Sequence, residues 1–145
     1  MARTHLLDTS VYSQLIRPAM PATVAGRWQV VGDDAMVIAS ICEAEVLYGI
    51  KKAGSARLLR DYDFAMKGRY HVLDVDSEVA ATYADLRVEC ERAGSTVQDM
   101  DLLIAATAKT HNLTVATLNY SDFARIPGLA VEDWSQPVSD TAHPC

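Results

Sequence analysis

The alternation of short apolar runs with longer helical patterns constrains the fold of this 145-residue chain more than any other feature. Apolar runs that are typical of strands occur near residues 4–8, 35–39, 70–73, 113–117 and 129–132. Helical patterns lie near residues 10–17, 21–31, 41–53, 55–67, 77–93 and 100–111. Because strands alternate with helices in this way when a parallel sheet is covered on both faces, we expect an α/β fold with about five parallel strands.

Two of the expected helices show how they pack. The helix at 77–93 has Asp76 placed as its N-cap and Gly94 as its stop signal. Its apolar residues recur at three- and four-residue steps, which predicts a buried stripe of Val79, Tyr83, Leu86 and Cys90. The helix at 100–111 is apolar nearly all round, as expected for a central helix.

Four acidic residues, far apart in the sequence, lie where strands end or helices begin. Asp8 ends the first strand, Glu45 and Asp101 lie near the starts of two apolar helices, and Asp122 follows the strand at 113–117 in a polar loop. In an open parallel sheet, ligands bind outside the carboxyl ends of the strands, where these positions meet. Since clustered carboxylates repel one another unless a cation neutralises them, the pattern predicts a hard divalent metal and hydrolytic chemistry.

Expected helix caps distinguish Glu45 and Asp101 from the acidic residues that lie two positions before each of them in the sequence. Ser40 and Glu43 have the spacing of a capping box, which gives Glu43 a structural task and leaves Glu45 available for function. Asp99 is placed as the N-cap of the helix that carries Asp101. We therefore expect Glu45 and Asp101 to be functional and their neighbours to stabilise helix ends.

Each candidate also has an ordinary structural explanation. Asp8 is compatible with an N-cap or an Asx turn, although Thr9 and Ser10 could serve as caps instead. In a first helical turn, the macrodipole favours a carboxylate such as Asp101 by about 0.3–1 kcal/mol. The polar loop around Asp122 has the composition of a common turn. The residues alone leave these alternatives open.

Composition and charge exclude several classes of protein. A net charge of −6 argues against a protein that coats nucleic acid, but not against an enzyme in which a metal supplies local positive charge. No apolar stretch approaches the roughly 18 residues of a membrane span, and the N-terminus lacks the apolar core of a signal peptide. We expect a cytoplasmic protein that makes no membrane contact.

Cysteines and histidines do not have the spacing of metal ligands. Cys42 and Cys90 are expected to be small buried side chains within helices, and Cys145 a thiol in the tail. The histidines are scattered and are expected at the surface or partly packed: His5, His71, His111 and His143. A zinc site built from these residue types is therefore not expected.

Positive charge is concentrated in one part of the chain. Six of the 13 Lys and Arg residues lie in a 19-residue window: Lys51, Lys52, Arg57, Arg60, Lys67 and Arg69. This window is either the solvated surface of a helical hairpin or a rim that follows phosphates. From Ser135 onward the sequence is polar, which predicts a domain at 1–134 and a flexible tail at 135–145.

Together these segments resemble the PIN-domain nucleases, specifically the VapC toxins of bacterial toxin–antitoxin pairs. The resemblance covers about residues 4–134 in the right order, and one mild departure is Ser10, where many members have Asn. The matching motifs are Leu-Leu-Asp8-Thr-Ser-Val, Ala44-Glu45-Val-Leu-Tyr-Gly, Asp101-Leu-Leu-Ile-Ala-Ala-Thr-Ala, and Thr117-Leu-Asn119-Tyr-Ser-Asp122-Phe-Ala-Arg-Ile-Pro-Gly-Leu with Val131-Glu-Asp-Trp134.

The resemblance implies a PIN-like three-layer α/β/α sandwich and an endoribonuclease that depends on Mg²⁺ or Mn²⁺. By motif match, it assigns an acidic metal site to Asp8, Glu45, Asp101 and Asp122, with Thr117 and Asn119 as supporting polar groups. Asp8 and Asp101 would be direct ligands, whereas Glu45 and Asp122 would bind directly, bind through water, or orient the attacking water. One metal ion and two remain alternatives.

The resemblance also implies partners. It implies a VapB-type antitoxin that inhibits the chain, a homodimer, a toxin–antitoxin hetero-oligomer, and operator DNA contacted only through the antitoxin. Structured RNAs such as tRNA are the implied substrates.

Two other functions remain as alternatives. One is a catalytically silent interaction module that acts through its antitoxin complex, and the other is a metal-dependent phosphatase or DNA nuclease. We expect the antitoxin to bind in a groove bordered by the helices at 41–67.

Overall fold

Five parallel strands form a single sheet within residues 2–138, the part of the chain that this computed structural model describes. The strands are β1 (His5–Leu7), β2 (Met36–Ala39), β3 (His71–Leu73), β4 (Thr114–Thr117) and β5 (Val131–Asp133). Their order across the sheet is β3-β2-β1-β4-β5, and every neighbouring pair is parallel. The expected parallel sheet is therefore confirmed.

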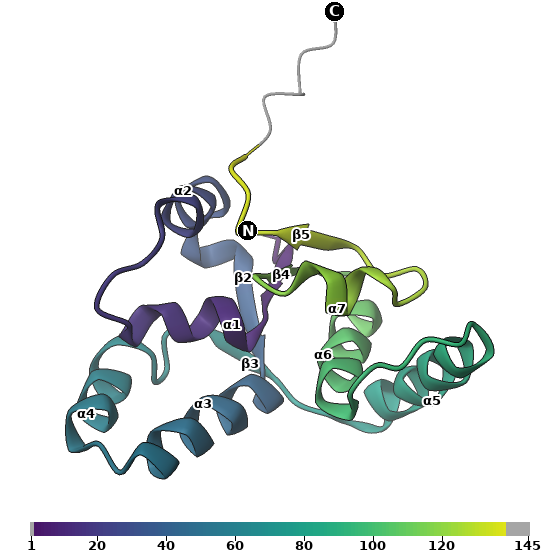
Figure 1. The fold of residues 1–145 in the computed structure, drawn as a ribbon, viewed down its shortest axis with the longest axis horizontal. Coiled ribbons are helices and arrows are strands. Elements are labelled where there is room, and N and C mark those ends of the chain that lie inside the picture. Colours follow the sequence, from purple (N-terminus) through teal and green to yellow (C-terminus); the bar gives the residue numbers. More distant parts are fainter. Residues whose placement is uncertain (1, 139–145) are drawn as a thin grey trace, which may run out of the picture.

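Helices connect the strands and flank the sheet. In chain order they are α1 (Thr9–Tyr12), the 3₁₀ helix η1 (Ser13–Ile16), α2 (Ala22–Val31), the 3₁₀ helix η2 (Asp33–Ala35), α3 (Ser40–Ala53), α4 (Ala56–Ala65), α5 (Ser77–Arg92), α6 (Asp99–Thr110) and α7 (Tyr120–Ala124). Figure 1 shows α1, α3 and α4 to the left of the sheet and α5 and α6 to its right. This is the expected α/β/α arrangement of three layers.

The core lies between the sheet and these helices. All four residues of β2 are buried, because a central parallel strand has helices on both faces. Six residues of α6 are also buried, which confirms its expected central position. In α5, Val79, Leu86 and Cys90 are buried and Tyr83 is only partly buried, so the stripe predicted from their spacing faces the core with Tyr83 at its margin.

The ends of α5 follow their sequence signals. Asp76 Oδ1 accepts a hydrogen bond from the Val79 amide at 2.9 Å, as an N-cap does. At the other end, Gly94 has φ 73°. The amides of Gly94 and Ser95 donate to carbonyls of the last turn at 3.1 and 2.9 Å, which is the Schellman pattern.

Two predicted caps are wrong because their helices begin one residue earlier than the pattern requires. Ser40 is the first residue of α3 and Ala39 precedes it, and no side chain caps this helix. Asp99 is likewise the first residue of α6 rather than its N-cap, and no side chain caps α6. The capping box assigned to Ser40 and Glu43 does not form.

Two other segments differ from their predicted structures. The helix expected at 10–17 is split into α1 and η1, and Arg17 is extended because the following Pro18 disfavours a helical conformation there. The polar loop expected around Asp122 is instead the short helix α7. Phe123 of α7 is 1% exposed, so packing against the core favours this helix although it is too short to show a periodic pattern.

After β5, the described chain lies against α2. Arg27 Nε donates to the Gln136 carbonyl at 3.1 Å, and Arg27 Nη2 donates to the Pro137 carbonyl at 3.0 Å. Residues 139–145 of the predicted tail, with Cys145, lie outside the described residues, and the division at residue 135 stays a prediction. Between residues 2 and 138, no helix has both the length and the apolar character needed to span a membrane.

Candidate functional site

The strand order places a crevice between β1 and β4. From β1 the chain proceeds outward through β2 to β3 on one side, whereas β4 and β5 lie on the other side. In open α/β sheets, ligands bind beyond the carboxyl ends of the strands at such a reversal. Asp8 directly follows β1, and Thr117 is the last residue of β4. Both residues therefore lie at the expected binding edge.

Asp8 is held at this edge by two hydroxyl groups. Its side chain is nearly buried, and Oδ2 accepts hydrogen bonds from Ser10 Oγ and Thr117 Oγ1, both at 2.8 Å. It also occupies the position before α1, but it makes no side-chain cap. Both of the hydroxyl hydrogen bonds are accepted by Oδ2, so within residues 2–138 Oδ1 is the Asp8 oxygen that is left to bind a ligand.

The same two hydroxyls hold the segment that follows β4. Ser10 Oγ accepts from the Leu118 amide at 3.0 Å, and Thr117 Oγ1 accepts from the Asn119 amide at 2.9 Å. Thr117 is fully buried and orients Asp8, whereas Asn119 is exposed and contributes its backbone to this network. The sequence suggested Ser10 only as a possible helix cap, whereas its hydroxyl, two residues after an Asp, is a common local partner of that Asp.

Glu45 reaches the site from α3. Its Oε1 accepts a hydrogen bond of 2.6 Å from Thr9 Oγ1, so successive residues at the start of α1 hold Glu45 and Asp8. Glu43 faces elsewhere: the pKa of Tyr62 is raised by burial and then by the charge of Glu43. Of the two glutamates, Glu45 is therefore the one at the site, as predicted. The reason is its hydrogen bond to Thr9, and not a capping box that occupies Glu43.

Asp101 lies among the other three carboxylates. Its pKa is raised from 3.8 to about 6, first by burial and then by the negative charges of Asp8, Asp122 and Glu45. The structure therefore brings together the four acidic residues that the sequence singled out. Its neighbour Asp99 faces α5 instead, where Oδ1 accepts a hydrogen bond from Tyr83 at 2.9 Å.

This crowding predicts a pH-dependent cost in stability. Asp101→Asn is expected to raise the free energy of unfolding of the metal-free protein at neutral pH by about 1–3 kcal/mol. The upper value corresponds to the full pKa shift, and solvent screening of the half-buried side chain reduces it. The folded chain keeps the Asp101 proton up to about pH 6, whereas the unfolded chain releases it near 3.8. The stability gained from this proton is present below pH 3.8 and is lost as the pH rises through about 6.

Urea unfolding across that pH range, with a chelator present, measures this difference between wild type and variant. Asp99→Asn is the matched control, since it changes the same charge on the same helix turn outside the cluster. Equal stability of wild type and Asp101→Asn at neutral pH would contradict the expected repulsion.

Asp122 differs from the other three because it has a cationic partner. Arg125 Nη2 lies 3.6 Å from Asp122 Oδ1, three residues along the chain at the end of α7. A hollow of about 280 Å³ is lined by both residues and by Asp101. The segment before α6 completes its wall with Thr96, Val97 and Gln98. Within residues 2–138, the acidic site therefore opens into a cavity that has the cation Arg125 at its edge.

The carboxylate oxygens available as metal ligands at this site fit a hard cation that keeps part of its water shell. No ion pair within residues 2–138 neutralises Asp8, Glu45 or Asp101. Cys42 lies buried beside Asp8, and its pKa is raised to about 12, mainly by burial, so it stays a neutral thiol. In the same part of the chain, no three His, Cys, Asp or Glu side chains converge closely enough to enclose an ion. Mg²⁺ suits such a site because it usually keeps several waters and binds one or two carboxylates.

A second hollow, of about 320 Å³, has Glu45 in its wall. Its floor is mostly apolar and is formed by η1, α3 and α4, including Ile16, Ile50 and Leu58. Arg17 and Arg57 also line it. This hollow borders the helices at 41–67, beside which the sequence predicted the antitoxin contact, and that contact stays a prediction.

Comparison with known proteins gives consistent matches over nearly the whole chain. The family model described as "PIN domain" matches residues 5–129. The chain is 35% identical to the tRNA(fMet)-specific endonuclease VapC of Salmonella typhimurium over 99 residues, which cover 68% of this chain and 75% of the relative.

The solved structures that are similar to this fold include the following two. One is FitAcB from Neisseria gonorrhoeae, with a TM-score of 0.82 and 28% identity, covering 92% of this chain and 100% of the other. The other is VapBC2 from Rickettsia felis bound to a DNA fragment from its promoter, with a TM-score of 0.77 and 28% identity. That match covers 89% of this chain and 97% of the other.

Proposed function

Because the chain belongs to the PIN-domain family, among the VapC toxin ribonucleases of VapBC toxin–antitoxin systems, we propose that it is a metal-dependent endoribonuclease. It hydrolyses RNA phosphodiester bonds with Mg²⁺ or Mn²⁺ and is neutralised by a VapB-type antitoxin. The observation that carries this proposal is the meeting of four carboxylates at the carboxyl edge of the sheet, where Asp8, Asp122 and Glu45 lie close enough to raise the pKa of the half-buried Asp101. Such a cluster is stable at neutral pH when a divalent cation joins it.

The four carboxylates have different tasks in this proposal. Asp8 and Asp101 would hold the ion directly, because Asp8 Oδ1 is not used by the two hydroxyls and the other three carboxylates all act on Asp101. Glu45 is fixed by Thr9 through Oε1 and uses its other oxygen to orient the attacking water. Asp122 acts through water, since Arg125 already offsets its charge.

Chain residues also prepare the site before RNA binds. Ser10 and Thr117 fix the orientation of Asp8, so the ligand oxygen does not need to be ordered when an ion arrives. An ion held by these carboxylates would supply a water of lowered pKa and would offset the charge that develops on the phosphate. The carboxylates provide the geometry, and the ion provides the positive charge that a chain of net charge −6 lacks.

The apolar hollow beside Glu45 is the proposed contact surface for the antitoxin. Its apolar floor suits an amphipathic segment, and Arg17 and Arg57 favour carboxylates at its edge. The similar Rickettsia felis structure is a complex of VapBC2 with promoter DNA. For this chain, operator DNA is contacted only through the antitoxin, because the chain itself is acidic. A homodimer and a toxin–antitoxin hetero-oligomer are the proposed assemblies.

A panel of defined nucleic acids tests the reaction class. With Mg²⁺ present, the purified protein is expected to cut structured RNAs, with tRNAs as the first candidates, and to leave DNA of matched sequence and simple phosphate monoesters intact. Gel separation and end sequencing measure which bonds are cut. Cleavage of DNA or of monoesters in place of RNA would contradict the proposal.

Lack of cleavage under all conditions, together with tight antitoxin binding, would instead support a catalytically silent interaction module. Growth arrest on expression without the antitoxin provides a second measurement, since a nuclease loses this effect when Asp101 is replaced.

A further inference from the structure

The wall of the acidic hollow includes the guanidinium group of Arg125, which two backbone carbonyls hold in place. Arg125 Nε donates to the Ser121 carbonyl at 3.3 Å, and Arg125 Nη1 donates to the Thr96 carbonyl at 3.3 Å. The first bond fixes the side chain to α7, and the second fixes it to the segment that precedes α6. The plane of the guanidinium is therefore set by two backbone atoms from different parts of the chain.

Arg125 retains donors that these contacts do not use. A guanidinium has five N–H groups, and two carbonyls occupy two of them. Its distance of 3.6 Å from Asp122 exceeds a hydrogen bond, so this pair is electrostatic and leaves Nη2 free to donate. The side chain is 45% exposed and lines the same hollow as Asp101. Free donors and exposure together make it accessible to a ligand.

The ligand that fits is a phosphate group of the RNA backbone. The hollow contains carboxylates that repel a phosphodiester, and Arg125 is the cation that lines it. A fixed, planar guanidinium binds phosphate oxygens through paired N–H groups. We propose that Arg125 binds a backbone phosphate next to the bond that is cut and so sets how RNA enters the acidic site. This inference rests on the proposed ribonuclease function.

A structural role for Arg125 makes a different prediction. Its bond to Thr96 also joins α7 to the segment before α6, so loss of the side chain could disturb the wall of the hollow. That effect would change affinity, but it would not change how many salt ions are released when RNA binds. The salt dependence of binding therefore separates the two roles.

The experiment measures binding of a labelled single-stranded RNA by fluorescence anisotropy over a series of NaCl concentrations. All proteins carry Asp101→Asn and the buffer contains EDTA, so the RNA stays intact. Arg125→Gln is expected to weaken binding by about tenfold and to make the slope of log K against log salt shallower by about 0.7, as for one lost phosphate contact. Arg125→Lys is expected to keep most of the slope, because it keeps the charge.

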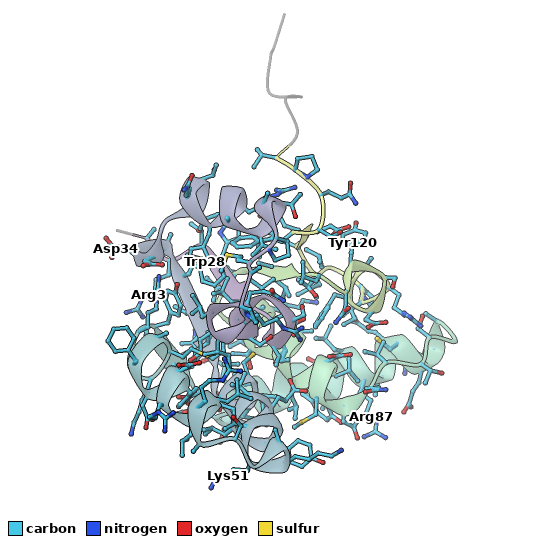
Figure 2. The ribbon with its side chains drawn as sticks, turned by 60° about the vertical axis from the view of Figure 1, so that its left-hand side comes forward. Arg3, Trp28, Asp34, Lys51, Arg87 and Tyr120 are labelled. Carbon is cyan, nitrogen blue, oxygen red and sulfur yellow. The ribbon has the colours of Figure 1, made fainter. Side chains whose placement is uncertain are left out.

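Arg3→Gln is the matched control. Arg3 is exposed before β1, at the amino ends of the strands and hence at the opposite edge from Asp8. Figure 2 shows Arg3 and Tyr120, the first residue of α7, on opposite sides of the molecule. Arg3→Gln should keep the wild-type slope, which shows that net charge alone does not explain the effect.

The outcomes separate this inference from the proposed function. An unchanged slope in Arg125→Gln, or an equal loss of slope in Arg3→Gln, overturns the role of Arg125 even if the wild-type protein cuts RNA. Failure of the wild-type protein to cut any RNA overturns the ribonuclease proposal itself. A shallower slope in Arg125→Gln that Arg125→Lys restores supports the phosphate contact.

Discussion

Excess EDTA is expected to stop RNA cleavage by the purified protein, and an excess of Mg²⁺ or Mn²⁺ is expected to restore it. Asp8, Glu45 and Asp101 are acidic groups without a cationic side-chain partner in the described chain, and a phosphodiester brings further negative charge. Loss of the ion removes several kcal/mol of charge stabilisation, which corresponds to at least about 10³-fold in rate. Single-turnover cleavage of an end-labelled RNA at neutral pH measures the change.

EDTA loaded beforehand with Mg²⁺ is the control, because it has the same ionic strength but does not remove the ion. Circular dichroism with and without EDTA shows whether the chain stays folded. Undiminished cleavage in excess free EDTA would rule out the metal mechanism. Arg125 and the hydroxyls around Asp8 would then be the candidate catalytic groups.

Much of the fold could be predicted because its central elements are buried on both sides. A parallel strand such as β2 is apolar at every position, and α6 is apolar nearly all round, so each stands out in the sequence. Elements that depend on distant partners could not be predicted in this way. The helix α7 has five residues and is held by burial of Phe123, which the local sequence does not reveal.

The carboxylates could be predicted for a related reason. Glu45 and Asp101 interrupt apolar helices, and an acidic residue in such a place needs an explanation. Of the residues that orient and supplement them, Thr117 was assigned a supporting role by motif match, whereas the roles of Ser10 and Arg125 were missed. Ser10 accepts a hydrogen bond from Leu118, and Arg125 donates to the Thr96 carbonyl. These contacts join segments that are distant in the sequence, so they become visible only when the chain is folded.

Asp101→Asn is expected to lower the cleavage rate by at least about 10³-fold while the protein stays folded. The amide has nearly the shape of the carboxylate but lacks its charge, so it binds a divalent cation weakly. Asp8→Asn is expected to cause a similar loss, because Asp8 offers the other proposed direct ligand oxygen. Single-turnover rates at saturating Mg²⁺ measure both effects.

Asp99→Asn is the matched control for these rates, because Asp99 lies on the same turn of α6 but contacts Tyr83 of α5. Unfolding cannot explain the expected loss in Asp101→Asn, since relief of repulsion from Asp8, Asp122 and Glu45 should make the metal-free variant more stable than the wild type. A variant that is more stable but inactive would show that the carboxylate is kept for its chemistry at a cost to the fold. Wild-type turnover by Asp101→Asn would remove this residue from the proposed metal site.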